Sequence, residues 1–148
     1  MSDTLSAAII SRDLETAVIG LQIRYFDRLA STNDTARDEA RGGSQEGTVV
    51  IAGIQEQGRG RLQRRWESPE GNIALSIVLY PPVERVPYLI MMTALAVCHA
   101  IREVTGLQAV IKWPNDVLIT GKKVCGILIE NELRPDGTAA AVVGIGIN

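Results

Sequence analysis

The second half of the chain contains four apolar runs that follow one another with only turn residues between them. They are residues 109–113, 117–120, 124–133 and, at the end of the sequence, TAAAVVGIGIN. Gly121-Lys122 is typical of a tight hairpin turn, and Pro135-Asp136-Gly137 is typical of a turn before the last run. These runs therefore predict consecutive strands, which favours a sheet that is mixed or largely antiparallel.

The first half alternates helical and extended patterns. Alanine, isoleucine and charged residues at helical spacing predict a short helix in residues 1–20, ending at Gly20. The stretch STNDTARDEARGG predicts a second helix with capping side chains at its start and two glycines at its end. Residues 87–104 predict a long buried helix, and strands are expected at 21–27, 48–55 and 72–80. The fold is therefore expected to be α+β, a mixed, largely antiparallel sheet flanked by helices.

Length and composition limit the class of protein. The 148 residues are enough for one domain with a real core, and 46% hydrophobic with 22% charged residues is ordinary for a globular protein. A net charge of −2 argues against a general nucleic-acid binder. No apolar run is expected to reach the length of a membrane span, and no secretion signal is recognised. Cys98 and Cys125 are expected to be buried thiols, so the predicted location is the cytoplasm, without membrane contact.

A local concentration of positive charge stands out against this acidic background. Residues 58–66 read GRGRLQRRW, with four arginines and a closing tryptophan between two predicted strands. The stretch lacks the pattern of a nucleotide-hydrolase phosphate loop. A nucleic-acid arm, a solvated hairpin tip and a loop that closes on an anionic ligand all remain open. Trp66, which suits stacking on a planar ring, and the glycines at 58 and 60 favour the closing loop.

Two further motifs carry charged residues at predicted strand ends. In KWPND (112–116), Asp116 is either a turn-capping residue or a ligand for a magnesium ion on a phosphate. In KKVCGILIE (122–130), the paired lysines are either solvated or point charges for carboxylate and phosphate groups. The residue types alone do not rank these alternatives.

Taken together, the motifs resemble those of the biotin protein ligases. The resemblance covers roughly residue 20 to the end and is specific, because GRGR-x-x-R-x-W and KWPND occur together in that family, whereas lipoate ligases share the fold but not the arginine loop. It implies a biotin/lipoate ligase type of catalytic domain. The motifs that carry it are Ser31-Thr32-Asn33, Gln55 followed by GRGRLQRRW, KWPND, KKVCGILIE and GIGIN at 144–148.

The resemblance implies a two-step reaction. Biotin's carboxylate attacks the α-phosphate of ATP, giving biotinyl-5′-AMP and pyrophosphate. A lysine of a biotin carboxyl carrier protein then attacks the mixed anhydride and releases AMP. Fixed cations and Mg²⁺ would offset the repulsion between carboxylate and polyphosphate. A loop that folds over the intermediate would shield it from water.

Matching positions give the residues implied for each role. The biotin site comprises Ser31, Thr32, Asn33, Gln55, Arg59, Gly60, Arg61 and Lys123. The ATP site comprises Arg64, Trp66, Lys112, Asp116 and Asn148, with Asp116 also a contact for Mg²⁺. Lys123, Arg61 and Asp116 are the expected catalytic residues; Lys123 contacts both the biotin carboxylate and the α-phosphate. Arg59 and Arg61 serve the acyl phosphate, and Trp66 stacks on the adenine. His99 matches no family position and is expected to be structural.

The resemblance also sets expectations for domains and partners. About 20 residues before the first strand are too few for the winged-helix DNA-binding domain of the repressor ligases, so no nucleic-acid partner is expected. The family's catalytic domain continues beyond GIGIN and a small barrel domain follows it. Residues 1–148 are therefore expected to form an incomplete catalytic domain without that barrel. Some family members form homodimers. The alternatives to a biotin ligase are a lipoate-type ligase and an inactive fragment that binds biotin.

Overall fold

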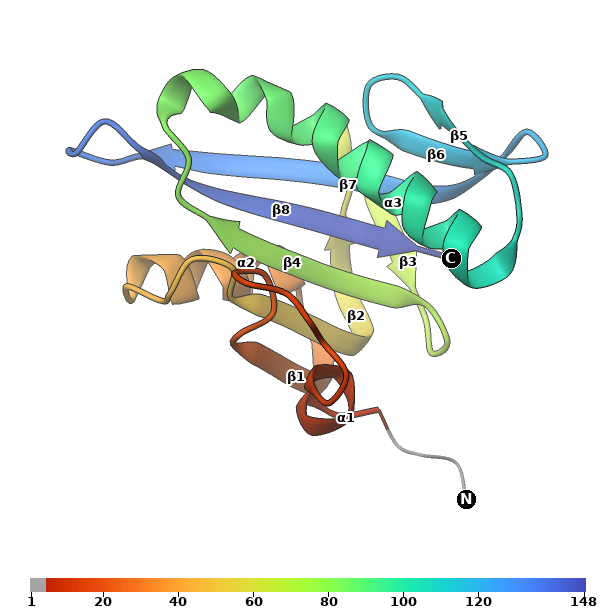
Figure 1. Cartoon of the computed structure of the whole chain (residues 1–148), viewed down its shortest axis with the longest axis horizontal. Helices are drawn as coiled ribbons and strands as arrows, with labels where there is room; N and C mark the ends of the chain where they lie inside the picture. Colours follow the sequence, from red (N-terminus) through yellow and green to blue (C-terminus); the bar gives the residue numbers. More distant parts are fainter. Residues whose placement is uncertain (1–4) are drawn as a thin grey trace.

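A computed structural model of the chain, which describes residues 5–148, shows a single twisted sheet with helices on both faces (Figure 1). The strand order is β1-β2-β4-β8-β7-β6-β5, and β3 pairs with β2 outside this path. Only β1 and β2 pair in parallel. The predicted mixed, largely antiparallel sheet is confirmed. Its strands are β1 (Ile23–Leu29), β2 (Val49–Arg59), β3 (Arg65–Ser68), β4 (Ile73–Leu79), β5 (Ala109–Lys112), β6 (Asp116–Ile119), β7 (Lys122–Leu133) and β8 (Ala139–Ile147).

Helix α2 (Thr32–Arg41) connects the two parallel strands and packs on one face of the sheet. Ser31 caps its N-terminus by accepting a hydrogen bond from the backbone N–H of Asp34. The predicted capping and the stop at Gly42 are confirmed. Alternate strand residues point to this face and form a core with the helix. That core comprises Ala36, Val50, Val78 and Val142.

Helix α3 (Leu89–Thr105), preceded by a 3₁₀ segment η2 (Val83–Tyr88), covers the opposite face over β5, β6 and β7. Gly106, with φ of 72°, ends the helix. Burial raises the pKa of Cys125 beneath this helix to about 12, so its thiol stays protonated at neutral pH. The core on this face comprises Ala94, Val97, Cys98, Ile101, Ala109, Val117, Cys125 and Ile127.

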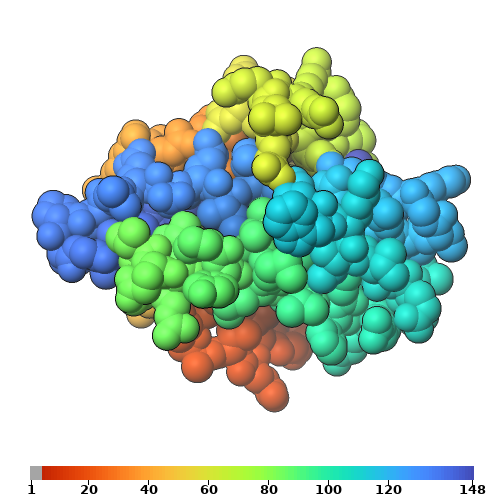
Figure 2. Space-filling view, turned by 90° about the horizontal axis from the view of Figure 1, so that it is seen from above, coloured from red at the N-terminus to blue at the C-terminus, as the bar shows by residue number. Residues whose placement is uncertain are grey.

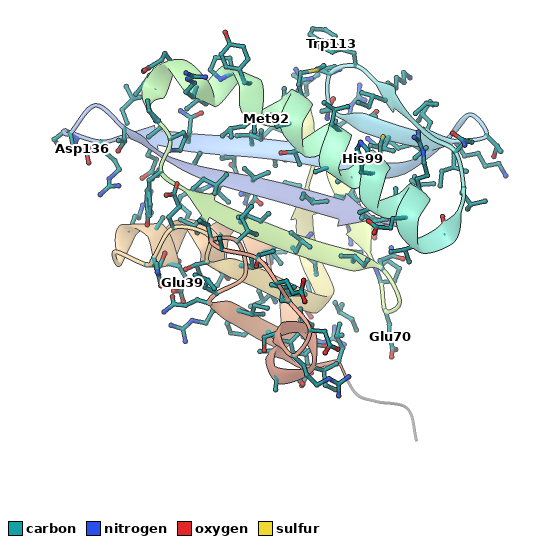
Figure 3. The ribbon with its side chains drawn as sticks, in the orientation of Figure 1. Glu39, Glu70, Met92, His99, Trp113 and Asp136 are labelled. Carbon is teal, nitrogen blue, oxygen red and sulfur yellow. The ribbon has the colours of Figure 1, made fainter. Side chains whose placement is uncertain are left out.

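The segment Val83–Thr105 is, by length and composition alone, long and apolar enough to cross a membrane. The expectation that no apolar run approaches this length is therefore wrong for η2 and α3. The inner side of α3 packs on the sheet, whereas its outer side exposes Met92 and Leu95. Figure 3 shows Met92 and His99 on α3, and the structure leaves His99 exposed on that helix.

Three local predictions differ from the structure. The helix expected in residues 1–20 is reduced to α1 (Ala7–Ser11), because none of its residues is buried and so short a helix gains little without packing; residues 1–4 lie outside the described part. The hairpin turn is Thr120-Gly121, one residue earlier than expected, with φ of 49° and 80°. Strand β2 continues to Arg59 and pairs with the unexpected β3, so part of the arginine motif is strand.

Candidate functional site

Three glycines form the floor of a pocket on the α2 face of the sheet. Gly126 of β7 and Gly146 of β8 are direct cross-strand partners, and Gly144 lies two residues before Gly146. A Cβ atom at Gly146 would collide with the indole of Trp66, and one at Gly126 would lie 2.9 Å from the same ring. A Cβ atom at Gly144 would collide with the amide of Asn33. The bare backbone therefore lets two side chains lie directly on the sheet.

A buried polar wall stands beside this floor at the N-terminus of α2. The Oε1 atom of Gln55 accepts hydrogen bonds from the backbone N–H of Thr32 at 2.8 Å and from its hydroxyl at 3.1 Å. Ser76 donates to the Oδ1 atom of Asn33 at 2.6 Å, and its oxygen lies 2.8 Å from the Thr32 hydroxyl. The members of the polar wall are Ser31, Thr32, Asn33, Gln55 and Ser76; all but Gln55 are less than 10% exposed.

Ser76 is a site residue that the sequence analysis missed. It lies in the apolar strand β4 and is fully buried, where it connects two predicted biotin-binding residues. A hydroxyl at an inward position of a strand needs a partner. The period-two pattern of IALSIVL places Ser76 on the same face as two buried residues, and that signal was available in the sequence.

The arginine loop is fixed at its first end by Arg59. The Arg59 guanidinium donates to both carboxylate oxygens of Asp34, at 2.8 and 2.7 Å, and to Glu130 at 3.4 Å. The hydrogen bonds from Arg59 are the main reason why the pKa of Asp34 lies below its ordinary value. The structure thus places the charge of Arg59 against two carboxylates rather than free for an acyl phosphate.

The tip of the loop adopts an unusual backbone. Leu62 and Gln63 have φ of 57° and 59°, the left-handed region that non-glycine residues rarely occupy. Arg61 reaches across to donate to the Oδ1 atom of Asn115 at 3.2 Å. Figure 2 shows the loop, in yellow, standing beside the cyan hairpin β5–β6 that carries Asn115. Gly58 is buried, and a Cβ atom there would collide with the Trp66 carbonyl, so it serves close strand pairing rather than loop motion.

The cationic side of the pocket comprises Arg61, Trp66, Asp116 and Lys123. The Nζ atom of Lys123 lies 2.8 Å from Asp116 Oδ1, an ion pair without hydrogen-bond alignment, and 5.3 Å from the centre of the Trp66 ring. The indole Nε1 of Trp66 is buried and has no hydrogen-bond partner. This side of the pocket thus contains a buried N–H group without a partner, which lies against Gly146, and a loosely held ammonium.

The structure brings most of the predicted site residues together. All eight predicted biotin-site residues and Trp66 line one cavity, whose free volume is about 50 Å³. Arg64 and Asp116 line a second cavity that shares Gly60, Arg61, Trp66 and Lys123 with the first. Lys112 and Asn148 line neither cavity: Lys112 is exposed, and Asn148 accepts a hydrogen bond from Asn72. The side chain of Trp113, labelled at the top of Figure 3, is also exposed and lines neither cavity.

A protein-only metal centre is not found in residues 5–148, where no group of three or more metal-ligating His, Cys, Asp or Glu side chains occurs. Asp116 is a single carboxylate beside a lysine. One carboxylate suits Mg²⁺ that is carried largely by waters and nucleotide phosphates.

Comparison with known proteins places these features in context. Residues 25–148 match the model of the biotin/lipoate A/B protein ligase family. The chain is 44% identical over 147 residues to the bifunctional ligase/repressor BirA of Bacillus subtilis, which covers 97% of this chain and 45% of that protein. It is also 44% identical over 103 residues to the biotin–[acetyl-CoA-carboxylase] ligase of Paracoccus denitrificans, covering 67% of this chain and 43% of that protein.

A solved structure shows the same architecture. The biotin protein ligase of Aquifex aeolicus, in complex with biotin and ATP, superposes with a TM-score of 0.72 at 35% identity. The match covers 86% of this chain and 52% of that one. The chain spans about half the length of the relatives it matches. The agreement confirms the fold expected from the motifs.

Proposed function

The chain belongs to the biotin/lipoate A/B protein ligase family, and on this basis we propose that its pocket binds biotin and ATP and forms biotinyl-5′-AMP. The activated biotin is then transferred to a lysine of a biotin carboxyl carrier protein. The observation that carries the proposal is the polar wall beside a glycine floor, under an arginine loop. The relatives from Aquifex and Paracoccus, named for biotin ligation, support the same substrate.

The polar wall suits the ureido ring of biotin. That ring has a carbonyl acceptor and two N–H donors, and Ser31, Thr32, Asn33 and Gln55 supply hydroxyl and amide groups of both kinds. A flat ring would reach the glycine floor only where the Trp66 indole now lies. Because the free volume is only about 50 Å³, well below the ~300 Å³ of a typical ligand pocket, binding requires Trp66 or the loop to move.

The cationic side suits the reacting groups. Lys123 would stand between the biotin carboxylate and the α-phosphate and reduce their repulsion, leaving its ion pair with Asp116. Arg61 and Arg64 would contact phosphate oxygens, and Trp66 the adenine. Asp116, once separated from Lys123, would share a Mg²⁺ ion that screens the leaving pyrophosphate.

A pyrophosphate-exchange assay, run with biotin and separately with lipoate, tests the proposal. Calorimetry with biotin alone precedes it. We expect micromolar or tighter biotin binding and exchange of labelled pyrophosphate into ATP that depends on biotin and on Mg²⁺. Exchange with lipoate but not biotin would identify the other ligase type, and binding without exchange would identify an inactive binding fragment.

The acceptor and the location form part of the same proposal. A biotin carboxyl carrier protein is supported by the Paracoccus relative, which is named for acetyl-CoA carboxylase. A cytoplasmic location would provide ATP and reduced thiols, and Cys98 and Cys125 are free and buried. Transfer of labelled biotin to a purified carrier domain, and its absence when the acceptor lysine is replaced by arginine, tests the partner.

A further inference from the structure

Four charged side chains, of which Arg59 lines the pocket and the other three do not, form an ionic cluster that connects three elements. The cluster comprises Asp34 and Arg37 of α2, Arg59 of β2 and Glu130 of β7. Arg59 makes a bidentate contact with Asp34, at 2.8 and 2.7 Å. Arg37 contacts Asp34 at 3.2 Å and Glu130 at 2.8 Å. Two carboxylates and two guanidiniums balance one another, so the cluster has no net charge.

The cluster is joined directly to the polar wall through Glu130. One oxygen of this carboxylate accepts a hydrogen bond from Asn33 Nδ2 at 2.8 Å and another from Arg59 at 3.4 Å. Ser76 donates to the other end of the same Asn33 amide. With a donor on Oδ1 and an acceptor on Nδ2, the amide has a single satisfied orientation. Glu130 therefore fixes Asn33 and the first end of the arginine loop together.

The side chains of the cluster are too exposed for their ion pairs to contribute much to the stability of the fold. The side chains of Asp34, Arg59 and Glu130 are 43%, 35% and 30% exposed. Ion pairs with this exposure contribute little to the free energy of unfolding. A bidentate carboxylate–guanidinium contact does, however, fix geometry. The consequence of the cluster lies in the position of the groups it holds.

We propose that Asp34 and Glu130 are positioning residues that hold Arg59 and Asn33 in the arrangement the biotin pocket needs, so that the arginine loop is tethered at its first end while its tip moves. The proposal rests on the proposed function only for the ligand's identity. Under it, Arg59 is an anchor, and Arg61 is the loop arginine left to contact the reacting groups. Neither Asp34 nor Glu130 touches the substrate.

Limited proteolysis with trypsin tests the tether without any ligand. The loop contains four arginines, and mass spectrometry identifies which bond is cut first. In the full chain, Asp34→Asn and Glu130→Gln should each raise the rate of cleavage after Arg59 or Arg61 about fivefold or more. Their urea unfolding midpoints should stay close to that of the unsubstituted chain.

Matched controls lie on the same two elements. Asp38→Asn alters α2 one turn later and removes a contact with Arg41 only. Glu132→Gln alters β7 two residues later and removes a contact with Arg41 and a 4.0 Å contact with Arg37, but none with Arg59, so Asp38→Asn is the stricter control. Neither control should accelerate loop cleavage. Equal cleavage rates in Asp34→Asn and Asp38→Asn would overturn the tether.

Calorimetry with biotin tests the effect on the pocket. Asp34→Asn and Glu130→Gln should each raise the Kd for biotin about tenfold, whereas Asp34→Glu, which keeps the carboxylate, should recover most of the affinity. The Kd for ATP should change less than threefold. Unchanged biotin affinity in both variants, in a chain that binds biotin, would overturn the positioning role. If the unsubstituted chain binds no biotin, the proposed function fails, and the proteolysis result still decides the tether.

Discussion

The polar wall and the cationic side of the pocket face each other, but they differ in how far their hydrogen bonding is complete. In the polar wall, Thr32, Asn33 and Gln55 are held by one another, by Ser76 and by Glu130. On the cationic side, the Trp66 Nε1 atom has no partner and the ion pair of Lys123 is poorly aligned. The hydrogen bonds of the first region are complete within the protein, whereas those of the second are not. Under the proposed function, recognition of the ring falls to the first region and the chemistry to the second.

Replacement of Lys123 should have the largest effect on pyrophosphate exchange. The substitution changes only the cationic side of the pocket. Lys123→Ala leaves the carboxylate and the α-phosphate without their fixed cation, so pyrophosphate exchange should fall by roughly a hundredfold or more. Biotin binding by the polar wall should change much less. Lys122→Ala, at the neighbouring exposed position outside both cavities, is the control. Near-normal exchange in Lys123→Ala would remove the role assigned to this residue.

Replacing a glycine of the floor by alanine tests whether the side chain above it can move. In Gly144→Ala the new Cβ meets Asn33, which is buried and bonded at both ends, so the free energy of unfolding should fall by about 1–3 kcal/mol. In Gly126→Ala it meets the outer edge of the Trp66 ring, which can shift, and the loss should be smaller. Equilibrium urea unfolding measures both. Equal losses would show that the two sides are equally rigid.

Ser76→Ala tests whether the hydrogen bonds of the polar wall matter. The substitution leaves the Asn33 Oδ1 atom buried without its donor, which should cost about 1–3 kcal/mol of stability and weaken biotin binding. Ser68→Ala is the matched control, because Ser68 is equally buried but its hydroxyl has no partner. That control should change stability by no more than about 0.5 kcal/mol. A larger loss in Ser68→Ala than in Ser76→Ala would contradict the assignment of the network.

Arg61→Gly tests the moving part of the loop. It removes the contact with Asn115 and the charge proposed to contact the reacting phosphate, while Arg59 keeps its contact with Asp34. We expect biotin to bind several-fold more weakly and biotinyl-AMP to escape into solution faster than from the unsubstituted chain. Chromatography of the free adenylate during turnover measures the leak. An unchanged amount of free adenylate would argue against a closing role.

The smallest expected effect is on the pH dependence of the free energy of unfolding. Because the pKa of Asp34 is lowered in the fold, its ion pair contributes fully above the ordinary value of 3.8, and the contribution is lost as the pH falls through the lowered value. The difference in unfolding free energy between the unsubstituted chain and Asp34→Asn should therefore be constant from pH 7 to about pH 5 and shrink below about pH 4. Urea unfolding at each pH measures it. A difference that grows on acidification would reverse the sign.

Much of the fold followed from simple patterns in the chain. Apolar runs bounded by turn residues gave every strand except β3, since burial and alternation depend on local sequence. Strand β3 and the end of β2 were not predicted, because glycine and arginine usually indicate a loop. Here Gly58 pairs with Trp66, and a Cβ atom there would collide with the Trp66 carbonyl and with the Gln55 amide. That contact is tertiary and leaves little trace in the sequence.

The residues of the candidate site could largely be predicted from the sequence, but the contacts between them could not. The motifs named the residues that line the pocket, and the structure brings most of them together. Ser76, Asp34 and Glu130 were not assigned roles, although two of them lie within the quoted motifs. Apart from the pair of Asp34 with Arg37 within α2, their contacts join residues 25 to 97 positions apart in the chain. Spacing along a single sequence does not reveal such pairs, and neither does it show that Arg59 already has two anionic partners.

The glycine floor has a consequence for how molecules of similar outline are told apart. The backbone groups of Gly126 and Gly146 lie in a paired ladder, so the floor supplies shape and little hydrogen bonding of its own. The thickness of a ligand ring is therefore limited by the floor, and its hydrogen-bonding groups are matched by the polar wall. An analogue with a bulkier ring should bind more weakly because it collides with the floor, whatever its heteroatoms. One with the right outline but a missing N–H should be refused by the polar wall, whose groups would be left unpaired.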